Sequence, residues 1–422
     1  MLESASLLDL SLLCTYGTPV ADMLAHSPSL PLILDYHDLY DYVTADDELG
    51  IITALEHRDR VRRIRMMQPI HILHRLIKAL HGEFPNLEYI FIERHTFFMP
   101  GVGSSLTLVI SETFRASRLR YLMVMGFHLP IGSPFMTMGN LVTLSLNFDV
   151  PWAYFHPNPL LQQLSPIPQL ESSRDTFNTC FPGDDNQLLR RAVMRRVAPY
   201  LRRFGFQGAN SYLEALLPRV TISLVERLQL YFLDQLKIYL ILPRRQFKSS
   251  SSQTVLLKII KLTFLKDHLR VDAYSHDTDF RTYRFGMTQS GRHLNWQLAS
   301  ITKFFGTLRT VFSPVEYLIL RYEGHSIPSE WNSEADPAEW REFLKTFNNL
   351  KALYMSYEFV RQLSRSLGPD EGESPTDLLP ELQDLGYYTI GDSRDSTLFA
   401  EFVHARRNAG RPVSVYEVVI PR

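Results

Sequence analysis

The amino-acid sequence predicts an α/β solenoid, with parallel strands on its concave side and helices on its outside. Three observations support this prediction. A nine-residue apolar pattern recurs along the chain, several copies follow an amphipathic helical stretch, and Pro, Asn or Ser usually stands where a strand should begin. Helix-then-strand units of this kind stack on their neighbours and bury one continuous core.

The recurring pattern has an apolar residue at position 1, Leu or Val at position 4, and apolar residues at positions 7 and 9. The copies are FPNLEYIFI (84–92), ASRLRYLMV (116–124), MGNLVTLSL (138–146), APYLRRFGF (198–206), ISLVERLQL (222–230), TVLLKIIKL (254–262, with Thr at position 1), FSPVEYLIL (312–320) and FNNLKALYM (347–355). Residues 167–175 and 379–387 begin correctly but lose the later apolar positions. The first of these two is therefore expected to be a failed strand.

The spacing of the copies indicates the type of solenoid. Position 4 recurs at steps of 22 to 35 residues, with a single step of 58 between Leu257 and Val315 that predicts one degenerate unit. Leucine-rich repeats have about 20–29 residues per unit. The predicted fold is therefore a leucine-rich-repeat-like solenoid (a horseshoe) over residues 51–422, preceded by an irregular N-terminal segment over residues 1–50.

Helices are expected directly before several strands. Residues 70–83 have their apolar side chains at helical spacing, which predicts an amphipathic helix. Residues 295–311 have a similar pattern before the strand that comes after them. In residues 335–346, Asp336 is the expected N-cap and Pro337 the first helical residue.

Composition narrows the class of protein. The 422 residues carry 44 basic and 45 acidic side chains, so the net charge of −1 gives no general reason to bind nucleic acid or an acidic membrane. Only Cys14 and Cys180 occur, which excludes a disulfide framework and fits a reducing compartment. The segment 225–243 contains charged residues and is not a membrane span, and Glu3 and Asp9 do not fit a signal peptide. An intracellular protein of the cytoplasm or nucleus is expected.

Candidate chemistry is sparse. Walker A, G-x-S-x-G, H-E-x-x-H and C-x-x-C motifs are absent, so no cofactor and no metal are expected. The polar run 35–41 could hold a metal, but short polar residues between turns produce the same pattern. A second cluster comprises Asp272, His276 and Asp279, near the end of a predicted strand. The alternative function is a hydrolase-like enzyme that uses these three residues. A solvated turn explains this cluster more simply, and we expect no enzyme.

The strand positions that face away from the core suggest a binding surface instead. If positions 4, 7 and 9 face the core, positions 6, 8 and 10 face the concave side. The residue types that recur there, Tyr, Arg, Met and Phe, are those enriched at protein interfaces. The predicted partner-binding residues are Tyr89, Phe91, Tyr121, Met123, Thr143, Ser145, Asn147, Arg203, Arg227, Tyr231, Tyr317, Arg321 and Tyr354.

Several blocks also resemble a known family. The chain is similar to the leucine-rich-repeat portion of F-box-type proteins from basidiomycete fungi. The matching blocks are LEHRDRVRRIRM (55–66), ETFRASRLRYLMVMGFHLPIGSPF (112–135), YFHPNPLLQQLSPIPQLE (154–171), GANSYLEALLPRVT (208–221), EWREFLKTFNNLKAL (339–353) and ARRNAGRPV (405–413). None of them contains catalytic residues.

The resemblance implies a substrate-recognition module. In such proteins an F-box binds the Skp-type linker of a cullin ubiquitin ligase, and the repeats hold a protein substrate. Residues 1–50 show no F-box pattern, and residues 6–24 resemble the segment that comes just after an F-box. A Skp-type partner is therefore expected only with an F-box encoded upstream. The expected function is a non-enzymatic protein-binding scaffold, with no nucleic-acid or membrane partner.

Overall fold

The structure is a computed structural model that comprises two units. The residues that it describes are 10–27, 29–37, 43–94, 107–127, 129–130, 132–148, 167, 169–177, 196–197, 201–208, 220–221, 227–232, 257–275, 285–291, 293–324, 331, 336–369, 372–389 and 399–419. The first unit comprises Met1–Gly208 and Pro218–Val225, and the second comprises Ala209–Leu217 and Glu226–Arg422.

The first unit contains a parallel sheet. Its strands follow the order of the chain, and all the pairings between them are parallel. They are β1 (Leu12–Cys14), β2 (Leu32–Tyr36), β3 (Val61–Gln68), β4 (Tyr89–Arg94), β5 (Tyr121–Met125), β6 (Thr143–Phe148), β7 (Ser172–Phe177) and β9 (Arg203–Gly208). A separate short parallel pair joins β8 (Arg196–Val197) to β10 (Val220–Thr221).

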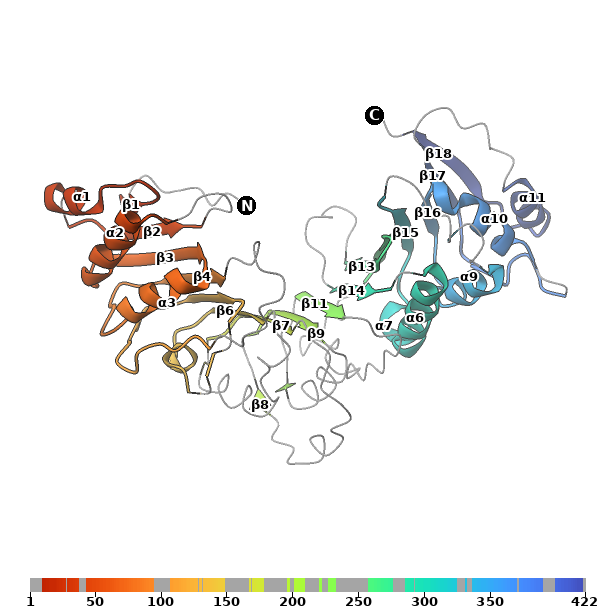
Figure 1. The fold of residues 1–422 in the computed structure, drawn as a ribbon. Coiled ribbons are helices and arrows are strands. Elements are labelled where there is room, and N and C mark those ends of the chain that lie inside the picture. Colours follow the sequence, from red (N-terminus) through yellow and green to blue (C-terminus); the bar gives the residue numbers. More distant parts are fainter. Residues whose placement is uncertain are drawn as a thin grey trace. The chain divides into compact units, whose positions relative to one another are not determined.

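Helices cover one face of this first sheet. They are α1 (Val20–His26), α2 (Ala45–Glu56) and α3 (Ile70–Ala79), followed by the short 3-10 helix η1 (Pro134–Thr137). Figure 1 shows α2 and α3 on the same side of strands β2 to β4. Leu73, Leu76 and Ile77 of α3 are buried, as the amphipathic pattern predicted.

The second unit contains a mixed sheet. Its strand order is β11-β14-β13-β12-β15-β16-β17-β18. The strands are β11 (Arg227–Phe232), β12 (Ile259–Phe264), β13 (His268–Tyr274), β14 (Phe285–Ser290), β15 (Tyr317–Tyr322), β16 (Ala352–Ser356), β17 (Asp384–Thr389) and β18 (Ser414–Val419). Strand β13 is antiparallel to both of its neighbours, and the other pairings in this unit are parallel.

The predicted leucine-rich-repeat solenoid is wrong. Such a solenoid needs each strand to run parallel to the one before it, unit after unit. Instead the chain reverses directly after β12, where the backbone N–H of Leu265 donates to the carbonyl of His268 at 2.8 Å. Strands β13 and β14 occupy the stretch where one degenerate unit was expected, and they make the sheet mixed. The fold is α/β, in two units rather than one continuous repeat array.

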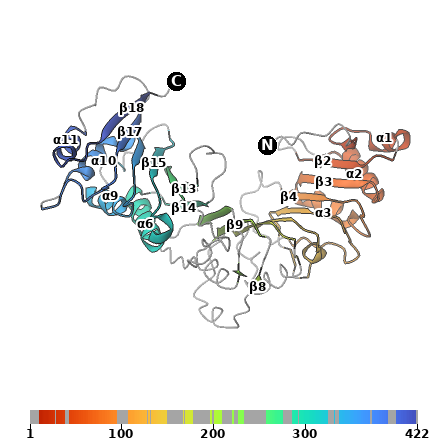
Figure 2. The same ribbon diagram turned by 180° about the vertical axis from the view of Figure 1, so that it is seen from behind.

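The helices of the second unit also lie on one face of its sheet. They are α6 (Leu294–Thr307), α7 (Arg309–Phe312), α9 (Pro337–Leu344), η4 (Tyr357–Phe359), α10 (Val360–Leu367) and α11 (Ala400–Asn408). Figure 2, seen from behind, agrees with Figure 1 in placing α6, α9, α10 and α11 on one side of β15 to β18. Between these layers Phe264 packs against Trp340, with ring centroids 6.0 Å apart, and Phe285 stacks on Phe304 at 5.6 Å.

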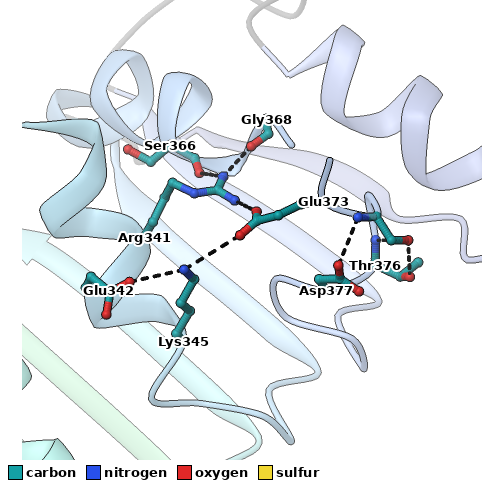
Figure 3. A network of polar contacts seen from close by, with 9 residues as sticks. Arg341, Glu342, Lys345, Ser366, Gly368, Glu373, Thr376 and Asp377 are labelled. Atoms are coloured by element: carbon teal, nitrogen blue, oxygen red, sulfur yellow. Dashed lines mark hydrogen bonds and ion pairs between the residues drawn. The ribbon is translucent and has the colours of Figure 1, made fainter. Parts of the chain in front are cut away.

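A buried arginine ties helix α9 to the loop after α10 (Figure 3). The Arg341 guanidinium donates to the carbonyl of Ser366 at 2.8 Å and to that of Gly368, and it pairs with the Glu373 carboxylate. Lys345 lies between Glu342, at 3.1 Å, and Glu373. Gly368 and Glu373, which follow α10, are therefore held against α9.

The strands expected from the eight complete copies are present, and secondary structure also occurs at three places where it was not expected. Asp336 caps α9 as predicted, because its carboxylate accepts from the backbone N–H of Ala338 at 2.9 Å. Residues 1–50, expected to be irregular, contain β1, α1, β2 and the start of α2. The expected failed strand is also wrong, since residues 172–177 form β7 and pair with both β6 and β9. The second incomplete copy, residues 379–387, overlaps β17, which begins at Asp384.

Candidate functional site

Each sheet presents one face that no helix of the described chain covers, which we call its open face. The burial pattern of the strands shows the two faces. In β11 and β15, buried residues alternate with partly exposed ones. The buried set packs under the helices, and the alternate set lies on the open face.

The predicted partner-binding residues fall on these open faces in two sets. The first unit holds Tyr89 and Phe91 on β4, Tyr121 and Met123 on β5, Thr143, Ser145 and Asn147 on β6, and Arg203 on β9; the second holds Arg227 and Tyr231 on β11, Tyr317 and Arg321 on β15, and Tyr354 on β16. Strand register brings members of each set together. Tyr89, Tyr121 and Thr143 are direct partners across β4, β5 and β6, and so are Phe91, Met123 and Ser145.

Not all of these residues are accessible. Tyr121 is 39% exposed, whereas Phe91 and Ser145 are only 9% and 7% exposed. The His37 ring covers Phe91, with their centroids 4.7 Å apart in an edge-to-face arrangement. Phe91 and Ser145 therefore support the open face of the first unit rather than present themselves to a partner. The side chain of Asn147 lies outside the part that the structure describes.

Charged groups on the open face of the first unit pair with one another. Arg65 and Asp35 form an ion pair at 2.8 Å, and His37 lies 3.5 Å from Glu93. Burial raises the pKa of the Tyr89 hydroxyl, and the nearby Arg65 acts in the opposite direction. Asp35 and His37, considered as metal ligands in the polar run 35–41, are thus held by Arg65 and Glu93. Asp38 and Asp41 lie outside the described residues.

The open face of the second unit has a charged centre. Lys261 on β12 is directly opposite Asp272 on β13 and Ile319 on β15. Asp272 is only 3% exposed, and its carboxylate accepts from Arg270 at 2.9 Å. Burial raises the pKa of this carboxyl group, and the Arg270 guanidinium partly opposes the shift.

An apolar cluster lies beside this charged centre. Ile259 and Tyr274 are buried, and Tyr317 and Ile319 pack against them. All four side chains lie on the open face, since Ile259 is in register with both Tyr274 and Tyr317. A small core thus exists on the side of the sheet that no described helix covers.

Tyrosine rings flank the charged centre on its other side. Tyr354 on β16 is directly opposite Gly386 on β17, and a Cβ atom at Gly386 would lie 2.7 Å from the Tyr354 Cε1 atom. The glycine therefore leaves room for the ring to lie across β17. Tyr388 stands 6.4 Å from Tyr354 between ring centroids, and Tyr416 on β18 is 48% exposed.

The geometry offers no observation in favour of the hydrolase-like alternative. Asp272 is held by Arg270 on its own strand, while His276 and Asp279 lie outside the described residues. Among the side chains that the structure describes, no group of three or more His, Cys, Asp or Glu could hold a metal ion. None of the helices in the described ranges is long and apolar enough to cross a bilayer.

The sequence did not point to several residues on the open face of the second unit. They are Lys261, Tyr274, Tyr388, Tyr416 and Gly386, which leaves room for the Tyr354 ring. Lys261 occupies position 8 of its nine-residue copy, so the pattern could have found it. Tyr388 was missed because the copy at residues 379–387 was judged incomplete. Its ninth residue, Tyr387, is in fact buried and belongs to the core.

The sequence was compared with protein-family models and with curated proteins. The chain matches no family model and no curated protein.

Proposed function

We propose that this chain is a non-enzymatic, protein-binding scaffold that holds its partner on the open face of the second unit. One observation supports this most: partly exposed Tyr317, Arg321, Tyr354 and Tyr388 lie on neighbouring strands of one face that no described helix covers. A solvated sheet face would favour Lys and Glu, whereas Tyr and Arg are enriched where proteins bind each other. Tyrosine adds contact area at a small cost in side-chain entropy.

The surface has the composition of a binding interface. The partly exposed Tyr317 and Ile319, which pack on the buried Ile259 and Tyr274, supply an apolar centre. Arg321, at the solvent-exposed end of β15, and Tyr416 on β18 supply a polar and aromatic rim. An apolar centre with a polar rim is the usual organisation of a protein interface.

The test replaces Tyr317, Tyr354 and Tyr388 together by Ala and compares the proteins that co-purify with the chain from its native cells. We expect a discrete partner to be lost, while Trp296→Ala retains it. Trp296 is a matched control because it is 50% exposed on α6, which lies on the helical side of the sheet. An identical set of partners for the two folded variants would refute the proposal.

We propose further that the scaffold acts inside the cell and delivers its partner to a cullin ubiquitin ligase. The support is the resemblance of six sequence blocks, from residues 55–66 to 405–413, to F-box-type proteins, together with a cysteine content typical of a reducing compartment. A pull-down with the product of the full-length transcript should recover Skp and cullin subunits. Their absence would remove this part of the proposal and leave the scaffold function standing.

A further inference from the structure

Lys261 is the most unusual side chain on the open face of the second unit. It is half-buried in β12, between Asp272 on one neighbouring strand and Ile319 on the other. Among the residues that the structure describes, no hydrogen bond or ion pair holds its ammonium group. A charged group removed from water without a partner is costly.

The neighbours of Lys261 increase that cost. Burial lowers the pKa of its ammonium group, and Arg321 lowers it further, while Glu323 and Asp272 oppose the shift. The two carboxylates are already engaged, because Asp272 pairs with Arg270 at 2.9 Å and Glu323 with Arg321 at 3.4 Å. The centre of the face therefore has positive charge in excess of its nearest negative charge.

Other charged groups of the second unit do not compensate this excess. Arg227 on β11 adds positive charge, and Asp384 on β17 lies beside the tyrosines, where it helps to raise the pKa of Tyr354. His268 is engaged with Asp267 at 2.7 Å. None of these described groups supplies the carboxylate that Lys261 lacks.

Apolar and aromatic groups lie around the Lys261 ammonium group, which pairs with no described side chain. Ile319 and Tyr317 of the apolar cluster lie on β15, and Tyr354 lies on β16 in direct register with Ile319. A ligand that fits must bring a negative charge to Lys261 and an apolar or aromatic group to the tyrosines. An extended acidic peptide segment has both, with alternate side chains about 7 Å apart.

We propose that Lys261, with Arg321 beside it, anchors a carboxylate side chain of an acidic segment in the protein partner, and that Tyr317 and Tyr354 contact the adjacent apolar residue. This inference rests on the proposed scaffold function and names the chemistry of its partner. The ion pair would form in a half-buried site, where charge-assisted hydrogen bonds are strong. The cost of an unpaired lysine in the free chain is then offset when the partner binds.

The experiment measures binding of a fluorescent random Glu-Tyr copolymer to the whole chain at low ionic strength by anisotropy, with a Lys-Tyr copolymer as the reference of opposite charge. We expect the Glu-Tyr copolymer alone to bind. Lys261→Met keeps the aliphatic stem and should weaken binding by about tenfold or more. Lys261→Arg should retain binding. Lys303→Gln, which removes one exposed positive charge from α6, should leave it unchanged.

Three results would overturn the inference. The first is no binding of the Glu-Tyr copolymer to the wild-type chain, and the second is equal binding to the Lys261→Met and Lys303→Gln variants. The third is tighter, Lys261-dependent binding of polyuridylate or heparin, which would indicate a polyanion rather than an acidic protein segment. The proposed scaffold function still stands after any of these results if the tyrosine substitutions remove a co-purifying partner. Failure of the inference about Lys261 can therefore be told apart from failure of the proposed function.

Discussion

At the residue scale, Gly386 determines where the Tyr354 ring lies. Gly386→Ala would place a methyl group within 2.7 Å of the Tyr354 Cε1 atom, so the ring must move. Overpacking of this kind costs typically about 1–3 kcal/mol. We predict that Gly386→Ala lowers the free energy of unfolding by that amount in urea and weakens partner binding. Gly306→Ala in α6, where no atom outside the local helix backbone lies within 4 Å of the added methyl group, should be neutral or stabilising.

Asp47 in the first unit is a second residue-scale case. Its carboxylate accepts from the Thr44 backbone N–H at 3.0 Å and from Gly17 N–H at 2.7 Å, and the Thr44 hydroxyl in turn caps α2. Burial acts to raise the pKa of Asp47, but the hydrogen bonds from Thr44 and Gly17 lower it overall. We predict that Asp47→Ala costs about 1–2 kcal/mol of stability at pH 7.

The pH dependence of that loss depends on the direction of the shift. A carboxyl group whose pKa is lower in the folded state stabilises the fold above its unfolded pKa, and this contribution disappears as the pH falls through its folded pKa. The wild-type chain and the Asp47→Ala variant should therefore converge in stability in acid. The neighbouring exposed Asp46 is the control. A loss of the same size for Asp46→Ala, or a difference independent of pH, would contradict the role given to Asp47.

At the element scale, Arg341 joins α9 to Ser366 and Gly368 around the end of α10 and to Glu373 beyond it (Figure 3). Removing a buried charge partner costs about 3–5 kcal/mol. We predict that Arg341→Met destabilises the chain by at least about 2 kcal/mol and makes residues 372–377 susceptible to limited proteolysis. Lys345→Ala, which removes a half-exposed partner of Glu373, should cost no more than about 1 kcal/mol. Equal protease resistance of the Arg341→Met and Lys345→Ala variants would refute the claim that Arg341 holds this segment against α9.

Some strands could be predicted from the sequence pattern and others could not. Strands β4, β5, β6, β15 and β16 were predictable because apolar residues alternate through each of them. Strand β14 was not, because its third inward position is the buried Gln289 in place of an apolar residue. Strand β7 was missed because Ser173 and Asp175 interrupt the alternation, although both are paired in register with β6 and β9. Pairing to two established neighbours outweighs the missing local pattern.

The open-face site was predictable only in part, for a related reason. Alternation alone places Tyr317, Arg321 and Tyr354 on one face. It does not show that Asp272 is already paired with Arg270, nor that no described side chain pairs with Lys261, since these contacts depend on side-chain geometry. The position of β13 in the sheet brings Asp272 opposite Lys261.

At the scale of the whole molecule, the observed fold differs from the predicted solenoid because of one tight turn after β12. Leu265, Lys266 and Asp267 connect β12 to β13, without the Asn-Gly or Asp-Gly pair that usually marks a tight hairpin. The repeat spacing therefore suggested another parallel unit where the chain reverses. A pattern of period two predicts strands but not their direction.

The division into two units leads to a prediction for the chain as a whole. Because each unit is compact around its own core, local destabilisation should stay within the unit where it is introduced. Asp47→Ala should accelerate amide hydrogen exchange in β2 and β3 and leave β15 and β16 unchanged, and Arg341→Met should do the reverse. Uniform acceleration in both units for either variant would show that the chain opens as a single cooperative unit.

Site-specific photo-crosslinking tests the central claim most directly, since it asks whether the open face of the second unit touches a protein partner. p-Benzoylphenylalanine is introduced at position 354, on the open face, or at position 296, on α6, and the whole chain is irradiated in its native cells. We predict a discrete crosslinked protein from position 354, none from position 296, and loss of the adduct when Tyr317 and Tyr388 are also replaced by Ala. Crosslinks from position 296 alone, or no adduct from position 354, would contradict the account.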